Sequence, residues 1–344
     1  MPNLENFLAY EHWQYDTVRH LLALTAAVFL AGFVYFLATS GESAPHYRLS
    51  STISAVVMVS AALEVLHLWL DWTTAFSHDA AAGLWRPTRE SLFSNGARYV
   101  NWSIDVPMLL TQVLVVLGFQ GAAFWRRWWR LAASGLLMVW TGYVGQYYEP
   151  PAAGLAPEAS EAPFWIWFLV SSAFYLHVLY ELRRAINRPE GDMPESAARE
   201  FERMWLLVLV SWTLYPLAYL VPAFWADADG VLARQGLLTV ADITSKLVFG
   251  VMLGRAARFR SAHEGWGRAL AADNRPTTAP AIREGYDLGS DQGFAAAAAA
   301  GATAAAVSAE TPPLLHAGTA PVGPAPVGAD PLGGGAARAT TDPA

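Results

Sequence analysis

The sequence predicts an all-α membrane protein folded as a seven-transmembrane-helix bundle with its N-terminus outside. Mean hydropathy is +0.27, and 54% of the residues are hydrophobic while only 15% are charged, which is too little charge for an ordinary soluble protein of 344 residues. Apolar segments long enough to cross a bilayer recur along the chain. Arginines gather in the connections expected on one side.

Each apolar segment has at least about 20 residues, which at about 1.5 Å per residue covers about 30 Å of hydrocarbon. Because most connections are short, consecutive helices are expected to be antiparallel neighbours. The longest connection, Trp72 to Gly96, contains GLWRPTRE and is expected to hold a small hairpin. The seven expected helices cover residues 17–40, 49–71, 97–119, 125–148, 163–187, 202–226 and 233–258.

The distribution of arginine predicts the orientation of the bundle. The connection after the fourth helix, residues 150–163, has no basic residue, so it is expected outside together with the N-terminus. The third and seventh helices then run from outside to inside. The arginines expected inside follow the third, fifth and seventh helices: Arg126, Arg127, Arg130, Arg183, Arg184, Arg188, Arg199, Arg203, Arg255, Arg258 and Arg260.

Three regions are expected along the chain. Residues 1–16 form an extracellular, aromatic-rich segment at the membrane surface, and residues 17–260 form the helical bundle. Residues 261–344 form a cytoplasmic tail that is largely disordered, because its Ala/Gly/Pro-rich sequence has no large apolar face to bury. The chain has no cysteine, which excludes disulfides and thiolate metal sites. A net charge of -7 argues against a nucleic-acid partner.

One lysine lies near the middle of the last apolar segment. Lys246 is the only lysine among the 22 basic residues, and a bare ammonium at that depth costs about 3 kcal/mol on insertion scales. Asp242 precedes it by four residues, so both side chains share one helix face. One interpretation is a buried ion pair that holds two helices together. The other is a neutral amine that condenses with an aldehyde to a Schiff base, with Asp242 as the counterion of the protonated imine.

The third apolar segment carries a polar stripe. Its members are spaced by 3, 4, 3 and 4 residues: Arg98, Asn101, Asp105, Met108 and Gln112. Lipid offers these polar groups no partners, so the stripe must face the bundle interior. A hydrogen-bonded ladder between helices is one explanation. The order by depth, with Arg98 outward and Gln112 inward, favours a pathway across the membrane.

The run RYVNWSIDVPMLL, together with Asp, three residues and Lys on the last helix, resembles the microbial rhodopsins over all seven helices but not the tail. Asn101, Asp105 and Gln112 at this spacing resemble the light-driven sodium-pump subgroup, since the outer and inner positions of proton pumps are commonly carboxylates. The resemblance implies all-trans retinal bound covalently as a Schiff base to Lys246, with Asp105 as counterion and transient proton acceptor. It also implies sodium bound transiently near Asn101, Asp105 and Asp242.

The expected function is therefore a light-driven outward sodium pump, a transporter and not an enzyme. Amides cannot ionise, so Gln112 cannot donate a proton and Asn101 cannot accept one. Asp105 becomes neutral when it takes the Schiff-base proton. Its negative charge then no longer traps the cation that passes from the inside to the outside. The alternatives are a light-driven outward proton pump, which such a protein could also be in the absence of sodium, a retinal photosensor, and a seven-helix receptor without retinal.

The resemblance also implies a chromophore pocket and an ion pathway. Around retinal it implies Trp102, Trp212, Tyr215, Pro216, Ser245 and Gly142. Along the pathway it implies Ser54, Ser60, Gln112, Gly254, Asn101 and Asp242, with Glu149 and Arg234 closing the exit. The serines are explained equally well by hydrogen bonds between helices, and Gly142 by helix packing.

Glu64, one turn outward of Ser60, departs from the pattern of the subgroup, which has an apolar residue there. We expect an auxiliary counterion that keeps Asp105 deprotonated over a wider pH range, because two carboxylates that share a buried cation cannot both keep ordinary pKa values. The alternative is a glutamate in an outer cavity.

The resemblance further implies a homo-oligomer, a pentamer, among the lipids of a bacterial cell membrane.

Overall fold

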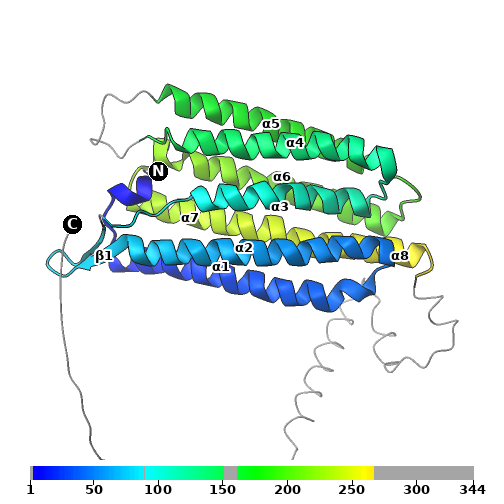
Figure 1. Cartoon of the computed structure of the whole chain (residues 1–344), viewed down its shortest axis with the longest axis horizontal. Helices are drawn as coiled ribbons and strands as arrows, with labels where there is room; N and C mark the ends of the chain where they lie inside the picture. Colours follow the sequence, from blue (N-terminus) through cyan, green and yellow to red (C-terminus); the bar gives the residue numbers. More distant parts are fainter. Residues whose placement is uncertain (1–2, 89, 151–160, 267–344) are drawn as a thin grey trace, which may run out of the picture. The chain divides into compact units, whose positions relative to one another are not determined.

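Seven long helices run side by side in the part of the chain that the computed structural model describes, residues 3–88, 90–150 and 161–266 (Figure 1). The predicted fold class is confirmed. The described residues all belong to one compact unit, Met1–Asn274. Of the tail expected at residues 261–344, the first residues continue the last helix to His263, and residues 267–344 lie outside the described part. The first six helices are α1 (His12–Thr39), α2 (Arg48–Ala75), α3 (Gly96–Val116), α4 (Gly121–Gln146), α5 (Ala162–Ile186) and α6 (Glu195–Phe224). The seventh is continuous through α7 (Ala228–Asp242), η4 (Ile243–Val248) and α8 (Phe249–His263).

Several helices extend beyond the apolar segments expected for them. Helix α1 begins at His12, not 17, because Glu11 and Gln14 form a reciprocal cap in which the Gln14 side chain accepts a 2.9 Å hydrogen bond from the Glu11 backbone N–H. Helix α6 begins at Glu195, not 202, with a polar first turn. Six of the described helices are long and apolar enough to cross a membrane. Helix α4 is the exception, because arginines and glycines dilute its apolar residues.

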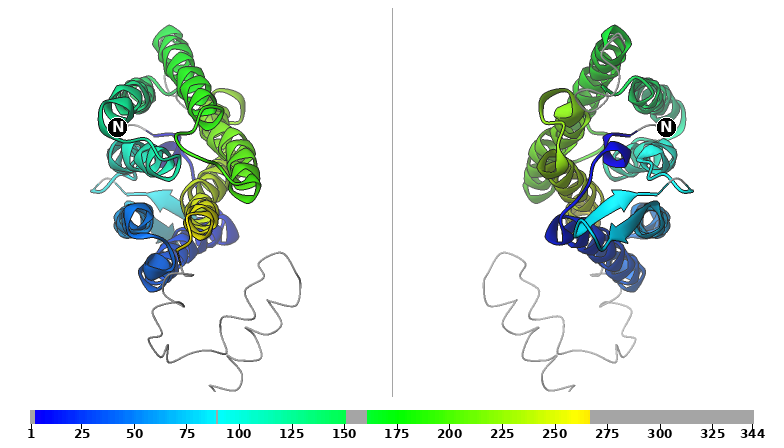
Figure 2. Two further views of the ribbon diagram at one scale, coloured as in Figure 1. Left: turned by 90° about the vertical axis from the view of Figure 1, so that its right-hand side faces the viewer. Right: turned by 90° about the vertical axis from the view of Figure 1, so that its left-hand side faces the viewer.

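The helices form a closed ring. Each one packs against the next in sequence, and the α7 part of the last helix returns to α1 (Figures 1 and 2). Helices α4 and α5 lie along one edge of the bundle in Figure 1, and α1 and α2 lie along the other. This closure turns the polar stripe of α3 towards the last helix, so the residues of interest gather inside the ring.

The expected hairpin is present between α2 and α3. Strand β1 (Phe76–Asp79) pairs antiparallel with β2 (Leu84–Pro87), and Gly83 in the connecting loop has a φ of +68°. Tyr10, just before α1, pairs with Trp85 of β2 as an isolated bridge. We call the end of the bundle that carries this hairpin the hairpin end. The opposite end, where Arg260 donates hydrogen bonds to two backbone carbonyls, is the arginine end.

The N-terminal segment does not lie on the membrane surface as expected. Its 3-10 helix η1 (Leu4–Phe7) is inserted into the hairpin end, and the side chains of Asn3, Leu4 and Glu5 are 0% exposed. Leu4 thereby removes its apolar surface from water, and Glu5 reaches buried polar partners inside the ring. The segment therefore closes this end of the bundle.

The last helix widens where it carries the lysine. Residues Ile243–Val248, which include Ser245 and Lys246, form one π-helical turn between α7 and α8. Such turns are rare and are often found at functional sites. Across the cavity, Pro216 lies inside α6, where one backbone hydrogen bond is missing because proline lacks an N–H. Both irregularities border the same internal space.

Candidate functional site

The lysine amine lies among three oxygen-bearing side chains. Lys246 Nζ is 2.9 Å from Asp242 Oδ1, 3.3 Å from Asn101 Oδ1 and 3.5 Å from Asp105 Oδ2. Lys246 is 2% exposed, and both carboxylates are 0% exposed. The attraction between such buried charges is screened far less than at a surface. The structure thus brings the predicted lysine and both predicted acids together.

Asp242 is held by donors from α3 and α6. Arg98 Nη1 donates to its Oδ2 at 2.6 Å, while Tyr215 and Trp102 donate to its Oδ1 at 2.8 and 3.3 Å. Tyr215 also shares a 2.9 Å hydrogen bond with Ser245, the residue beside the lysine. Hydrogen bonds to a carboxylate favour its ionised form. Asp242 is therefore fixed as an anion, whereas neither oxygen of Asp105 has a hydrogen-bond partner among the described residues.

The amides of the α3 stripe each meet a serine of α2. Asn101 donates to Ser60 at 2.6 Å, on the level of the lysine. Towards the arginine end, Ser54 donates to Gln112 at 2.8 Å, and Gln112 is 0% exposed. The amide nitrogen of Gln112 has no hydrogen-bond partner in the described part of the chain. These pairs place polar atoms at two depths of an otherwise apolar core.

The glycine that packs beside Ser54 is Gly250, and the role of Gly254 at the inner mouth stays a prediction. A side chain at Gly250 would lie 3.1 Å from Ser54 Oγ and 2.6 Å from the ring of Phe36. Gly254, the residue expected at this mouth, lies one turn further on, where only Arg258 would be within 4 Å of an added carbon. The close approach of α2 to the last helix therefore depends on Gly250, which sequence spacing alone did not single out.

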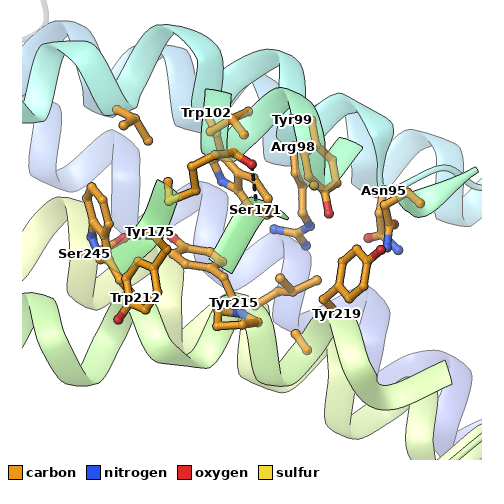
Figure 3. Close-up of a pocket in the computed structure, with 18 of the residues that line it drawn as sticks. Asn95, Arg98, Tyr99, Trp102, Ser171, Tyr175, Trp212, Tyr215, Tyr219 and Ser245 are labelled. Carbon is orange, nitrogen blue, oxygen red and sulfur yellow. Dashed lines mark hydrogen bonds between the residues drawn. The ribbon is translucent and has the colours of Figure 1, made fainter. Parts of the chain in front are cut away.

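A largely apolar cavity opens onto the lysine (Figure 3). All six residues predicted around the chromophore line it: Trp102, Trp212, Tyr215, Pro216, Ser245 and Gly142. Its wall also includes Tyr99, Met138 and Ser171, and Ser171 donates to the Met138 carbonyl at 2.8 Å. An added carbon at Gly142 would lie 3.3 Å from Ser171 Oγ and 3.4 Å from the Tyr99 ring, so a larger residue would narrow the cavity. An aromatic, largely apolar cavity with a buried amine in its wall fits a long apolar aldehyde.

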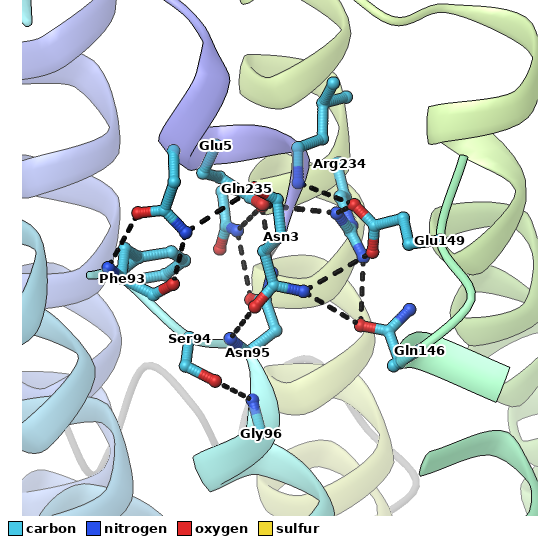
Figure 4. Close-up of polar contacts among 12 residues, drawn as sticks. Asn3, Glu5, Phe93, Ser94, Asn95, Gly96, Gln146, Glu149, Arg234 and Gln235 are labelled. Atoms are coloured by element: carbon cyan, nitrogen blue, oxygen red, sulfur yellow. Dashed lines mark hydrogen bonds and ion pairs between the residues drawn. The ribbon is translucent and has the colours of Figure 1, made fainter. Parts of the chain in front are cut away.

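A buried polar network fills the hairpin end (Figure 4). Arg234 donates to both oxygens of Glu149 at 2.9 Å, so the two residues predicted at the exit are in contact. Glu5 of the N-terminal segment is the second carboxyl group, 3.3 Å from the same guanidinium. Gln235 donates to Glu5 at 2.9 Å and to Asn95 at 3.1 Å. Sequence analysis did not identify Glu5, Gln235 or Asn95, because no local spacing connects them.

Glu64 lies between this network and the lysine cluster. One of its oxygens is 3.9 Å from Arg98 Nη1, yet neither oxygen has a hydrogen-bond partner within the described residues. Its side chain is 4% exposed. Arg98 links the two groups, since its Nη2 donates to Gln235 at 3.1 Å. No group of three or more His, Cys, Asp or Glu side chains in the described ranges is arranged to hold a resident metal ion.

A helical ring that surrounds a buried lysine, two acids and an aromatic slot defines a chromophore-binding membrane protein. The family profile described as "Bacteriorhodopsin-like protein" matches residues 16–259. The chain belongs to this family, the microbial rhodopsins, and is a multi-pass membrane protein. Members of the family bind retinal through a Schiff base to a lysine, and Lys246 is the only lysine available here.

Relatives and solved structures agree with this assignment. The chain is 23% identical to the blue-light absorbing proteorhodopsin of Gamma-proteobacterium Hot 75m4, over 70% of this chain and 86% of that protein. It is 28% identical to cruxrhodopsin-3 of Haloarcula vallismortis, over 67% and 86% of the two chains. Thermophilic rhodopsin superposes with a TM-score of 0.67 at 29% identity, over 75% of this chain and 99% of that one. Xanthorhodopsin, described as a light-driven ion pump with dual chromophore, gives 0.67 at 26% identity, over 76% and 100%.

Proposed function

We propose that this rhodopsin is a light-driven pump that exports sodium, with the hairpin end outside and the arginine end in the cytoplasm. The orientation rests on the arginine-rich connections, which favour the cytoplasmic side. We further propose that it works as a homo-oligomer in a bacterial cell membrane. Xanthorhodopsin, a relative of similar fold, is named an ion pump, which supports transport over sensing.

The carrying observation is the chemistry of the α3 stripe. Asp105 is its acid, 3.5 Å from Lys246 Nζ, while the positions one turn outward and two turns inward are the amides Asn101 and Gln112. An amide side chain does not ionise, so it neither accepts nor donates a proton near neutral pH. A proton taken by Asp105 therefore has no carboxylic partner on the stripe, whereas amide and hydroxyl oxygens are suitable ligands for a hard cation.

When bound, retinal supplies a light-driven isomerisation that changes the direction and proton affinity of the nitrogen on Lys246. Asp105 is the acceptor for the proton of that nitrogen, since Asp242 is already held by Arg98, Tyr215 and Trp102. Protonation of Asp105 cancels one negative charge beside the path. A cation can then pass without being trapped by two anions.

The pathway follows the paired amides and serines. Sodium would enter past Ser54 and Gln112, where the glutamine oxygen is already an acceptor, and would reach Asn101 and Ser60 at the level of the lysine. It would bind transiently among Asn101, Asp105 and Asp242. The return of the proton to Lys246 restores a positive charge at this level and blocks backflow. Arg234 and Glu149 would form the last barrier at the exit.

The test is to illuminate cells or right-side-out vesicles that contain the pigment, in NaCl and in KCl, with and without a protonophore. Sodium export makes the interior negative and draws protons in, so the medium becomes alkaline in NaCl and more so with protonophore. In KCl this signal should vanish. Acidification that the protonophore abolishes in both salts would instead identify an outward proton pump, and a pigment without any flux would identify a photosensor.

A further inference from the structure

Three acids and two cations share the buried centre, and their charges do not cancel. The acids are Glu64, Asp105 and Asp242, and the cations are Arg98 and the protonated nitrogen of Lys246. If all five were ionised, the centre would carry one uncompensated negative charge away from water. Such a charge is strongly disfavoured, and groups so placed bind a proton instead. One of the three acids must therefore be neutral in the dark.

The contacts distinguish the three acids. Asp242 receives a guanidinium bond of 2.6 Å and an amine bond of 2.9 Å, so it stays ionised. Asp105 faces the amine at 3.5 Å. Glu64 has the weakest support, because the only cation within 4 Å of it is Arg98, at 3.9 Å, and that guanidinium already donates to Asp242.

The one other cation that faces Glu64 is Lys246, and that amine already lies beside Asp242 and Asp105. From α3 Glu64 faces Arg98 and Asp105, and from the last helix it faces Asp242 and Lys246. The buried residues of α1 include no charged side chain. His67, one turn along α2, is largely exposed and pairs with Asp71 instead.

We propose that Glu64 holds this proton in the dark and releases it to the outside when a sodium ion enters the centre. The proposal rests on the proposed sodium transport and adds a second proton site to it. After Asp105 takes the proton of Lys246, the centre is neutral, with Arg98 balanced by Asp242. Arrival of sodium adds one positive charge, and loss of the Glu64 proton cancels it. When sodium leaves, Glu64 takes one proton back, so no proton is transported in a complete cycle.

Glu64 lies beside polar side chains that continue to the hairpin end. Glu64 is next to Arg98, whose Nη2 contacts Gln235 at 3.1 Å. Gln235 in turn donates to Glu5 at 2.9 Å in the buried network of Figure 4. Glu64 is also on the hairpin side of Asp105, because it lies one turn beyond Ser60 along α2, and Ser60 pairs with Asn101 at the level of the lysine.

The dark state is tested by absorption titration of the retinal-loaded protein. If Glu64 is neutral, Glu64→Gln keeps the wild-type absorption maximum at neutral pH. Wild type should then show an alkaline shift to shorter wavelength as Glu64 ionises beside the cation, and Glu64→Gln should lack that shift. A move of the Glu64→Gln maximum to longer wavelength at neutral pH would mean that an anion had been removed, and this would overturn the proposal. This readout does not depend on transport.

The coupling is tested by flash excitation with a pH-indicator dye in the medium, in NaCl and in KCl. Wild type in NaCl should release and rebind about one proton per excited molecule, Glu64→Asp should retain this transient, and Glu64→Gln should lose it. His67→Gln, an exposed residue on the same helix, is the matched control and should behave as wild type. A transient that persists in Glu64→Gln, or a wild type without one, refutes the release step. Wild-type flux in the salt-exchange assay is measured on the same vesicles, so failure of sodium export is recognised separately.

Discussion

Arg234→Ala should weaken the hairpin end severely. Arg234 is 2% exposed and donates to both oxygens of Glu149, to Glu5 and to Gln146, so its removal leaves two buried carboxylates without their shared cation. Breaking a buried ion pair by removing one partner costs about 3–5 kcal/mol. At about 2–4 °C per kcal/mol for a domain of this size, the pigment should bleach about 6–20 °C lower than wild type.

Glu5→Gln separates charge from shape in the same network. It leaves the two 2.9 Å bonds between Arg234 and Glu149 intact, and its amide oxygen can still accept from Gln235 and Asn95, so the main loss is the 3.3 Å ion pair. The expected loss is near the lower end of the roughly 1.5–3 kcal/mol typical of a hydrogen bond to a charged group, or about 3–6 °C. Arg199→Ala is the matched control, because Arg199 pairs with Glu195 at an exposed site where ion pairs contribute little.

The assay is loss of visible absorption during slow heating in detergent, together with the rate of bleaching by hydroxylamine at 25 °C. Hydroxylamine should reach the lysine faster in Arg234→Ala, since the closed end is disrupted. If Arg234→Ala bleached within about 3 °C of wild type, or if Glu5→Gln were equally damaging, the argument from uncompensated buried charge would be wrong.

Three further variants test the site and the hairpin. Asp105→Asn should still form pigment, because Lys246 remains, but with absorption at longer wavelength and no light-driven sodium flux; an absorption scan and the salt-exchange assay check both. Gln112→Glu places a titratable group on the arginine side of the stripe, so light-driven acidification in KCl should rise, which a pH electrode records; no rise would contradict the assignment of Gln112 as a proton barrier. The pKa of Asp79 in the hairpin loop is lowered from its usual 3.8, because the backbone N–H groups of Ala82 and Ala81 donate to it and Arg86 is close. A lowered folded-state pKa means stability that is present above the unfolded pKa and lost as pH falls through the folded one. At pH 7, the backbone amides of the hairpin should therefore exchange their hydrogens faster in Asp79→Asn than in wild type. The difference should fade as the pH falls below 3.8.

The local part of the site could be predicted because helix geometry is regular. Lys246 and Asp242 are four residues apart, and the structure joins their side chains at 2.9 Å. The α3 stripe shares one face for the same reason, and lipid forces that face inward. The hairpin between α2 and α3 was predicted from the length and composition of its connection.

The parts that could not be predicted involve contacts between distant segments. Glu5 meets Arg234 across 229 positions, and nothing in residues 1–16 indicates that the segment enters the bundle. The π-helical turn at Lys246 was also missed, since its sequence resembles that of an ordinary helix. The contact of Gly250 with Ser54 was not predicted, because a small shift between two helices decides which residue faces which.

The sequence by itself determined the seven spans, the lysine and its acid, and the polar stripe, because hydrophobic length and the helical repeat are properties of short segments. Only the tertiary structure decided which acids share which cations. Arg98 and Lys246 both donate hydrogen bonds to Asp242, whereas Glu64 lies 3.9 Å from Arg98. Which acid is best supported by the cations therefore depends on how three helices approach one another. Charge balance in a buried centre is a sum over all neighbours, so it becomes readable only when the ring of helices has closed around it.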